Sequence, residues 1–92
     1  MVTITNQSFR DSGGLDVFPN LHIGRIIYGN VIFAEGQREA MARADIALED
    51  IANVRRLTHV FEVKHQLDID DRPGPGKYSC FAYGTGYSES TE

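Results

Sequence analysis

The chain has 92 residues, enough for one domain, and carries a formal net charge of −4 from thirteen acidic and nine basic residues. Its 41% hydrophobic content places it among globular chains and outside the range of disordered ones. The negative charge argues against nucleic-acid phosphates or anionic lipid as the main ligand, because like charges repel, and it favours approach to a basic surface.

Cysteine usage and the N-terminus bear on the compartment. Cys80 is the single cysteine, so no internal disulfide can form. Met1 to Arg10 alternates apolar and polar residues without a continuous apolar run, so neither a signal peptide nor a membrane span is expected. We therefore expect a cytoplasmic location.

The first third of the chain predicts β-structure. Residues 2–5 alternate apolar and β-branched polar residues, which is typical of a short strand. Leu21–Tyr28 and Val31–Ala34 are rich in Ile, Val, Tyr and Phe. Gly29-Asn30 between them suits a tight hairpin with the glycine at positive φ, so we expect these two strands to pair with each other.

A helix is predicted from about Gln37 to Arg56. Apolar residues recur there at spacings of three and four, as on one face of a helix, at Ala40, Ala44, Ala47, Leu48, Ile51 and Val54. The alanines on this stripe allow close approach to a sheet. Glu39 stands four residues before Arg43, an arrangement that supports a helix.

Two further strands are predicted after the helix. In residues 58–65, strict alternation places Phe61 and Val63 on one face and Val60 on the other. Residues 77–83 (KYSCFAY) form the last expected strand, with Tyr78, Cys80 and Ala82 on one side and Ser79, Phe81 and Tyr83 on the other.

The remaining segments are predicted to be irregular. Residues 67–76 contain two prolines and two glycines and are expected to form a long exposed connection, and residues 84–92 a flexible C-terminal tail. The overall expectation is an α+β fold in residues 1–83, in which an antiparallel sheet of four or five strands packs on one amphipathic helix.

The sequence offers no convincing catalytic or cofactor site. Gly74-Pro75-Gly76-Lys77 lacks the spacing of a phosphate-binding loop, since Asp71 and Tyr78 stand where that motif needs glycine and Ser or Thr. The histidines, at positions 22, 59 and 65, lack the close pairing of a zinc site with Cys80. A strand cysteine among Tyr78, Phe81 and Ala82 is typical of core packing. We expect no enzyme, no metal and no cofactor.

Contact residues are a better prediction than catalytic ones. Asp68, Asp70 and Asp71 form either a solvated acidic loop tip or an electrostatic contact for a basic partner. Tyr28, Tyr78, Tyr83 and Tyr87 suit either the core or an interface, because tyrosine combines a large rigid ring with a hydroxyl.

The chain resembles the small phage-encoded anti-CRISPR proteins that act on the type I-F surveillance complex. The resemblance is carried by VTITNQSFRDSGG, AMARADIALEDIANVRRL and DIDDRPGPGKYSCFAYG, about half of the sequence. It implies a compact, non-enzymatic inhibitor that occludes the basic surfaces along which guide RNA pairs with target DNA. The implied partners are protein subunits of a CRISPR ribonucleoprotein, with guide-RNA contact left open, in the host cytoplasm.

The leading hypothesis is therefore stoichiometric inhibition of such a complex without direct DNA binding or membrane association. Its predicted partner-binding residues are Asp68, Asp70, Asp71, Arg72, Tyr78 and Tyr83. One alternative is a small phage or bacterial structural module that forms a homo-oligomer through an exposed strand edge. A second alternative is a thiol or metal enzyme built on Cys80.

Overall fold

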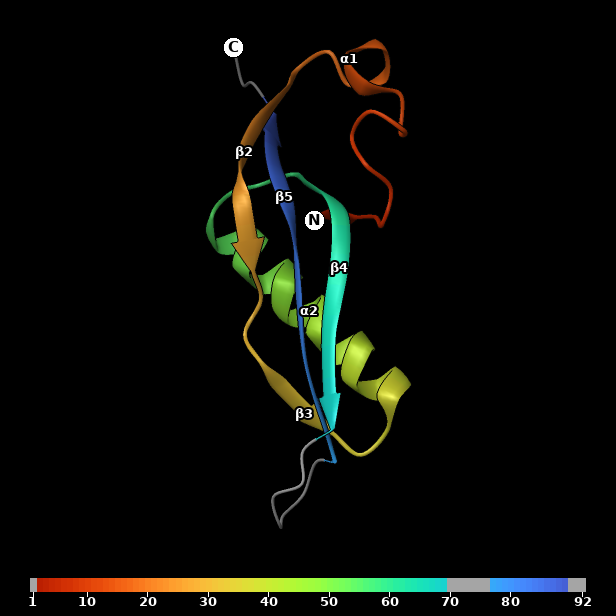
Figure 1. The fold of residues 1–92 in the computed structure, drawn as a ribbon. Coiled ribbons are helices and arrows are strands. Elements are labelled where there is room, and N and C mark those ends of the chain that lie inside the picture. The colour runs from red at the N-terminus through yellow and green to blue at the C-terminus, as the bar shows by residue number, and fades with distance from the viewer. Residues whose placement is uncertain (1, 70–76, 90–92) are drawn as a thin grey trace.

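The computed structural model describes residues 2–69 and 77–89. These residues form a five-stranded sheet and one main helix, which confirms the expected α+β class (Figure 1). In chain order the elements are β1 (Thr3–Ile4), α1 (Gly14–Val17), β2 (Leu21–Tyr28), β3 (Ile32–Ala34), α2 (Gln37–Val54), β4 (His59–Ile69) and β5 (Tyr78–Glu89). None of the helices in these residues is both long and apolar enough to cross a membrane.

Strand β5 is the centre of the sheet. It pairs antiparallel with β4 along one side and with both β2 and β3 along the other (Figure 1). The short β1 pairs with the beginning of β4, and this pairing is parallel. The sheet is therefore mixed, although its three longer pairings are antiparallel as expected.

The predicted hairpin between β2 and β3 is wrong. Both strands pair with β5, at Tyr28↔Tyr83 and Ile32↔Cys80, and so lie one after the other along the same side of it. Gly29 between them does not have positive φ. It lies against α2, where a Cβ atom would stand 2.9 Å from the backbone nitrogen of Leu48. The glycine is needed for this close approach rather than for a tight turn.

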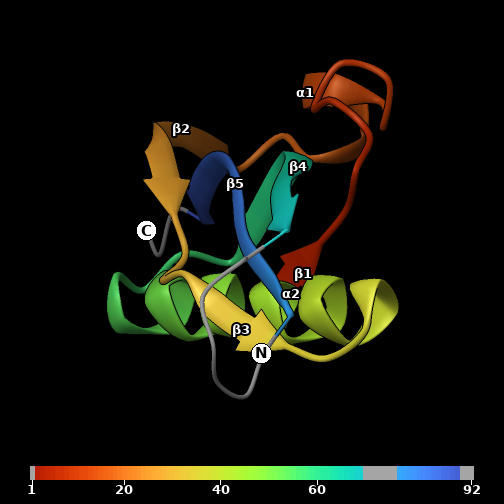
Figure 2. The same cartoon turned by 60° about the horizontal axis from the view of Figure 1, so that its bottom comes forward.

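Helix α2 covers one face of the sheet (Figure 2). Its buried residues are Ala40, Ala44, Leu48 and Ala52. They pack with apolar residues of β2 to β5, among them Ile27, Val60, Val63, Cys80 and Ala82, in the main core. The stripe was predicted correctly up to Leu48, whereas Val54 is 81% exposed because the helix ends there. The Glu39–Arg43 ion pair forms at 2.7 Å on the outer surface of the helix.

A bulge interrupts the alternation of β4. The register to β5 shifts between Phe61 and Lys64, and Glu62 within the shift has a φ of 56°. Val60 and Val63 therefore both lie in the main core, while Phe61 belongs to a second cluster. The prediction that Phe61 and Val63 share a face is wrong, because one extra residue reverses the facing of everything after it.

The expectation of a flexible tail from residue 84 is wrong as far as Glu89. Strand β5 continues through Glu89, and Tyr87 is buried. The two glycines of this segment make room for core side chains. A Cβ atom on Gly84 would stand 2.8 Å from Val60 Cγ1, and one on Gly86 2.4 Å from Leu57 Cδ1. Residues 90–92 of the predicted tail, and residues 70–76 of the predicted connection, lie outside the described residues.

A second, smaller cluster lies on the face of the sheet opposite α2. It consists of Leu21, Phe61 and Tyr87, with Phe9 and Phe18 packed against them. The rings of Phe9 and Tyr87 stack with centroids 4.6 Å apart. The N-terminal segment that carries Phe9 and α1 therefore covers one end of this face, and no other part of residues 2–69 and 77–89 covers the rest of it (Figure 2).

Candidate interaction surface on the open face of the sheet

The uncovered part of the sheet carries a group of large apolar side chains, here called the aromatic face: Ile26, Tyr28, Phe33, Phe81 and Tyr83. The strand register brings them to one side, because directly opposed residues point to the same face. Tyr28 lies opposite Tyr83, and Ile26 opposite Thr85. Tyr28 is 60% exposed and Ile26 58%, and exposed apolar side chains that lie together in one patch mark an interaction site, whereas singly scattered ones do not.

The three rings at the centre of the aromatic face support one another. Tyr28 and Tyr83 stack with centroids 5.7 Å apart and an interplanar angle of 26°. Phe81 lies 5.9 Å from Tyr83 and 6.4 Å from Tyr28. The three rings already contact one another in the free chain, so part of the side-chain ordering that association requires is already present.

Two adjoining hollows extend this surface toward the N-terminal segment. The larger measures about 330 Å³ and is lined by Ser8, Phe9, Arg10, Ile23, Phe61, Glu62, Thr85 and Tyr87. The smaller measures about 130 Å³ and is lined by Ile26, Glu62, Lys64, Tyr83, Gly84 and Thr85. Because Glu62 and Thr85 line both, the hollows form one depression, here called the sheet-face groove.

The bulge of β4 places charge in the middle of the sheet-face groove. Glu62 is exposed, and its left-handed backbone conformation is one that a glutamate rarely adopts. Its N–H donates to the carbonyl of Gln7 at 2.8 Å, which fixes the bulge against the N-terminal segment. Arg10 and Lys64 line the two hollows on either side of it. The groove therefore offers an apolar floor with charges of both signs.

The predicted partner-binding residues are only partly brought together. Asp68 is exposed and lies opposite Ser79 on the open face, and Tyr83 lies in the aromatic face. Tyr78 is on the other face, half-buried against the main core, and so does not join them. The remaining three residues, Asp70, Asp71 and Arg72, lie outside the described residues.

Sequence reasoning missed Ile26, Phe33 and Phe81 as surface residues. A signal was present for Phe81, since alternation in the last strand placed it beside Tyr83. No comparable signal exists for Ile26 and Phe33, because their exposure depends on β2 and β3 lying side by side with β5 rather than with each other.

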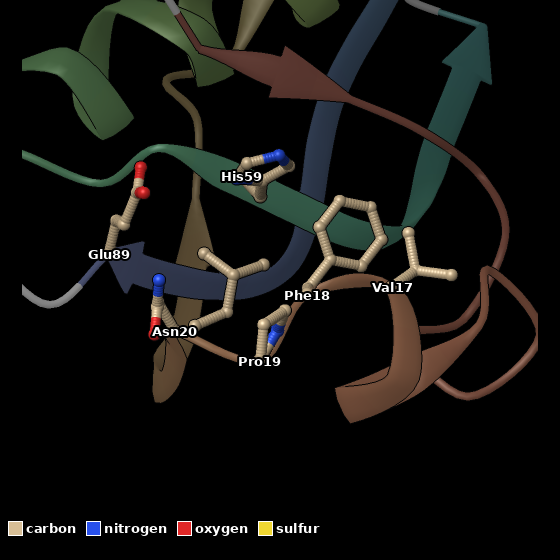
Figure 3. Close-up of a pocket in the computed structure, with 7 residues that line it drawn as sticks. Val17, Phe18, Pro19, Asn20, His59 and Glu89 are labelled. Atoms are coloured by element: carbon tan, nitrogen blue, oxygen red, sulfur yellow. The ribbon is translucent and has the colours of Figure 1, made fainter.

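A third hollow, of about 150 Å³, lies at the far end of the sheet (Figure 3). It is lined by Val17, Phe18, Pro19, Asn20, Leu21, His59 and Glu89. The ring of His59 stacks on that of Phe61 with an interplanar angle of 4°, and its Nδ1 lies 3.0 Å from the Thr58 hydroxyl. At this size the hollow suits a few water molecules better than a substrate.

The other candidate ligands are separated by the fold. His22 is exposed on β2, whereas Cys80 is buried in the main core. His65 points toward α2, where its Nε2 lies 2.7 Å from Asp45 Oδ1. Within residues 2–69 and 77–89, no group of three or more metal-ligating side chains gathers.

We predict that Cys80 is unreactive in the folded protein. Burial, and then the negative charges of Asp45 and Asp68, raise the pKa of its thiol above the ordinary value of 9.0. Burial, and then the charge of Glu62, likewise raise the pKa of Tyr87 above 10.0. A thiol reagent such as 5,5′-dithiobis(2-nitrobenzoic acid) is expected to label Cys80 only on unfolding; rapid labelling under native conditions would contradict the buried position.

The same pKa shifts give a direction for alkaline stability. Both groups lose their protons more readily in the unfolded chain, so the free energy of unfolding is expected to stay level below pH 9 and to fall as the pH rises through the folded-state values. Urea unfolding measured from neutral to alkaline pH checks this, with Cys80→Ala expected to show a weaker decline.

We compared the chain with known protein families, proteins and structures. No protein-family model, no curated protein and no solved structure matches this chain. The functional inference therefore depends on the aromatic face and the sheet-face groove themselves.

Proposed function

We propose that this chain is a non-enzymatic binding protein that docks on a protein partner through its aromatic face and sheet-face groove. The observation that carries the proposal is the ring cluster of Tyr28, Phe81 and Tyr83, which is preformed on the uncovered side of the sheet with Tyr28 60% exposed. A few residues carry most of the binding energy of a protein interface, and tyrosine is enriched among them. Aromatic residues in general are enriched in interfaces.

A protein partner fits the surface better than a single-stranded nucleic acid does. Exposed rings on an open sheet can stack bases, but such sites also need a basic groove for the phosphates. Here Lys64 and Arg10 share the surface with Glu62 and Asp68, and the whole chain carries a net charge of −4. Phosphates would be repelled, whereas a protein surface with apolar and cationic side chains would be complementary.

The specific partner that we propose is a type I-F CRISPR surveillance complex, inhibited by occlusion of the path along which guide RNA pairs with target DNA. Support comes from the sequence resemblance, from the acidic net charge, and from a binding surface on a small rigid domain. Asp68, Asp70 and Asp71 remain the predicted electrostatic part of the contact, and Arg72 is predicted to supply packing and hydrogen bonds beside them.

The test compares two pairs of exposed apolar side chains on opposite sides of the molecule. Ile26→Ser/Tyr28→Ser alters the aromatic face, and Ile46→Ser/Val54→Ser alters the outer surface of α2, where these residues are 59% and 81% exposed. Binding to purified type I-F complex is measured by biolayer interferometry, and inhibition by target-DNA binding of the complex as the chain is titrated in.

We expect the aromatic-face variant to lose about thirtyfold or more in affinity, since two interface anchors are removed, and the α2 variant to lose less than about twofold. Inhibition by the unaltered chain should be complete near one chain per binding site. Equal losses for the two variants would contradict the binding surface, and lack of any binding by the unaltered chain would contradict the assigned partner.

A further inference from the structure

Among the residues that the structure describes, none pairs with the outer edge of β4 over the second half of the strand. Strand β1 and the N-terminal segment pair with β4 only as far as Val63, whose N–H donates to the Thr5 carbonyl at 3.1 Å. From Lys64 to Ile69, β4 pairs on its inner side with β5, and among the described residues no strand pairs with its outer side. An open edge of this kind is a template for another strand.

The backbone groups that face outward follow from the pairing of Val63. Successive residues of a strand direct their N–H and C=O groups to alternate sides. Since the N–H of Val63 points away from β5, those of His65 and Leu67 also point away from it, and those of Lys64, Gln66 and Asp68 point toward it. The open edge therefore presents the backbone N–H donors and C=O acceptors of His65 and Leu67.

We infer that two copies of this chain associate by antiparallel pairing of their β4 edges, with Gln66 on the twofold axis. This register places His65 opposite Leu67 of the second copy, and the outward groups of both residues then form hydrogen-bonded pairs on either side of the axis. Gln66 lies opposite its own copy in the intervening pair without backbone hydrogen bonds, where side chains come closest. The result is one continuous sheet through both copies.

The side chains on the open face make this register self-complementary. Lys64, Gln66 and Asp68 all point to that face, opposite Tyr83, Phe81 and Ser79 of β5. Pairing about Gln66 sets Lys64 opposite Asp68 of the second copy, twice over by symmetry. Within one chain, the Gln66 side-chain nitrogen lies 3.5 Å from Asp68 Oδ1, and Lys64 has no ion pair with a described residue. Two cross-strand ion pairs therefore become available on association.

The outer edge of β2 is less suited to the same role. Its register to β5 shifts between Ile23 and Ile26, so its backbone groups do not alternate regularly. Gly24 and the exposed Arg25 occupy the shift. A bulge and a lone charge at the middle of an edge oppose strand addition, whereas the charges on β4 match a second copy of themselves.

The first test exchanges the charges at the β4 edge. The mass of the purified chain is measured by sedimentation over a concentration series, and the unaltered chain is expected to dimerise more weakly as salt rises. Lys64→Asp and Asp68→Lys each create two like-charge pairs and should weaken dimerisation by about tenfold or more. The double variant Lys64→Asp/Asp68→Lys restores opposite charges in the same register and should recover the dimer.

The second test fixes the register itself. In Gln66→Cys the two new thiols oppose each other in a pair whose Cα atoms lie about 4.5 Å apart, close enough for a disulfide. In Lys64→Cys the two thiols are separated by four residues along the edge, about 13 Å, and cannot meet. Mild oxidation should therefore cross-link Gln66→Cys, but neither Lys64→Cys nor the unaltered chain with its buried Cys80.

The inference is overturned if the unaltered chain is a monomer at every concentration, or if the double variant dimerises no more tightly than the single variants. Equal cross-linking of Gln66→Cys and Lys64→Cys would also overturn it. The inference does not rest on the proposed function, because the mass of the purified chain is measured without any partner, although Lys64 and Asp68 belong to both surfaces. Circular dichroism of each variant confirms that the fold is retained.

Discussion

Replacing Leu48 with alanine is expected to lower the free energy of unfolding by about 3–4 kcal/mol. Leu48 is fully buried at the centre of the α2 stripe, between alanines that cannot fill the space it would leave. A chain of this length has a total stability of only about 5–14 kcal/mol, so the loss is a large fraction of it. Urea unfolding followed by circular dichroism measures the effect.

Ile46→Ala on the same helix is the matched control. Ile46 is 59% exposed, so its truncation removes little buried area and introduces a better helix former. We expect a change within about 0.5 kcal/mol. A comparable loss in both variants would mean that α2 is not packed on the sheet by its alanine-leucine stripe.

Gly29→Ala is the second large effect, at about 2–3 kcal/mol of lost stability. An added Cβ atom would stand 2.9 Å and 3.0 Å from the backbone nitrogen and Cα of Leu48, and helix backbone cannot rotate out of the way as a side chain can. The N–H of Gly29 also donates to the Ala82 carbonyl at 2.8 Å, which holds the link between β2 and β3 in place. Relief of the clash must therefore separate α2 from the sheet.

Gly36→Ala provides the comparison for Gly29. Gly36 precedes α2 with extended backbone, and no atom lies within 4 Å of an added Cβ. Alanine lowers the conformational entropy of the unfolded chain, which stabilises the fold, but it is a poorer N-cap than glycine, which destabilises the helix. Because the two effects oppose each other, we expect almost no change in the free energy of unfolding. If Gly29→Ala were equally harmless under the same urea titration, the close approach of α2 to the β2–β3 link would be wrong.

The candidate surface shows where local pattern stops being informative. Alternation placed Tyr83 and Phe81 on one face and Tyr78 on the other, which the structure bears out. It could not show that Tyr78 faces α2, because a strand pattern does not say which face the helix covers. Ile26 and Tyr28 join the surface only through the pairing of β2 with β5.

Glycines were the most misleading residues in the sequence. Gly29 suggested a hairpin turn, and Gly84 and Gly86 lie in a segment that was predicted to be a flexible tail. In the folded chain all three allow neighbouring atoms to approach, those of Leu48, Val60 and Leu57 respectively. Glycine is favoured both where the backbone needs an unusual conformation and where a neighbouring atom leaves no room for a side chain. Only the surroundings of a glycine in the folded chain show which of these two properties is used.

Local sequence determined the elements whose signals repeat along the chain. The period of α2, with Ala40, Ala44 and Leu48 inward, and the β-branched run of β2 were both readable from residue spacing. The α+β class followed from them, because one apolar helix stripe and several strands have few ways to bury their faces together.

Tertiary structure alone decided which strands are neighbours, where β4 bulges, and which aromatic side chains stay uncovered. These features depend on contacts between residues far apart in sequence, as in the pairing of β2 with β5 or of Glu62 with Gln7. A single shift of register reverses the facing of every later residue. The physical reason is that long-range packing, and not local preference, sets the register.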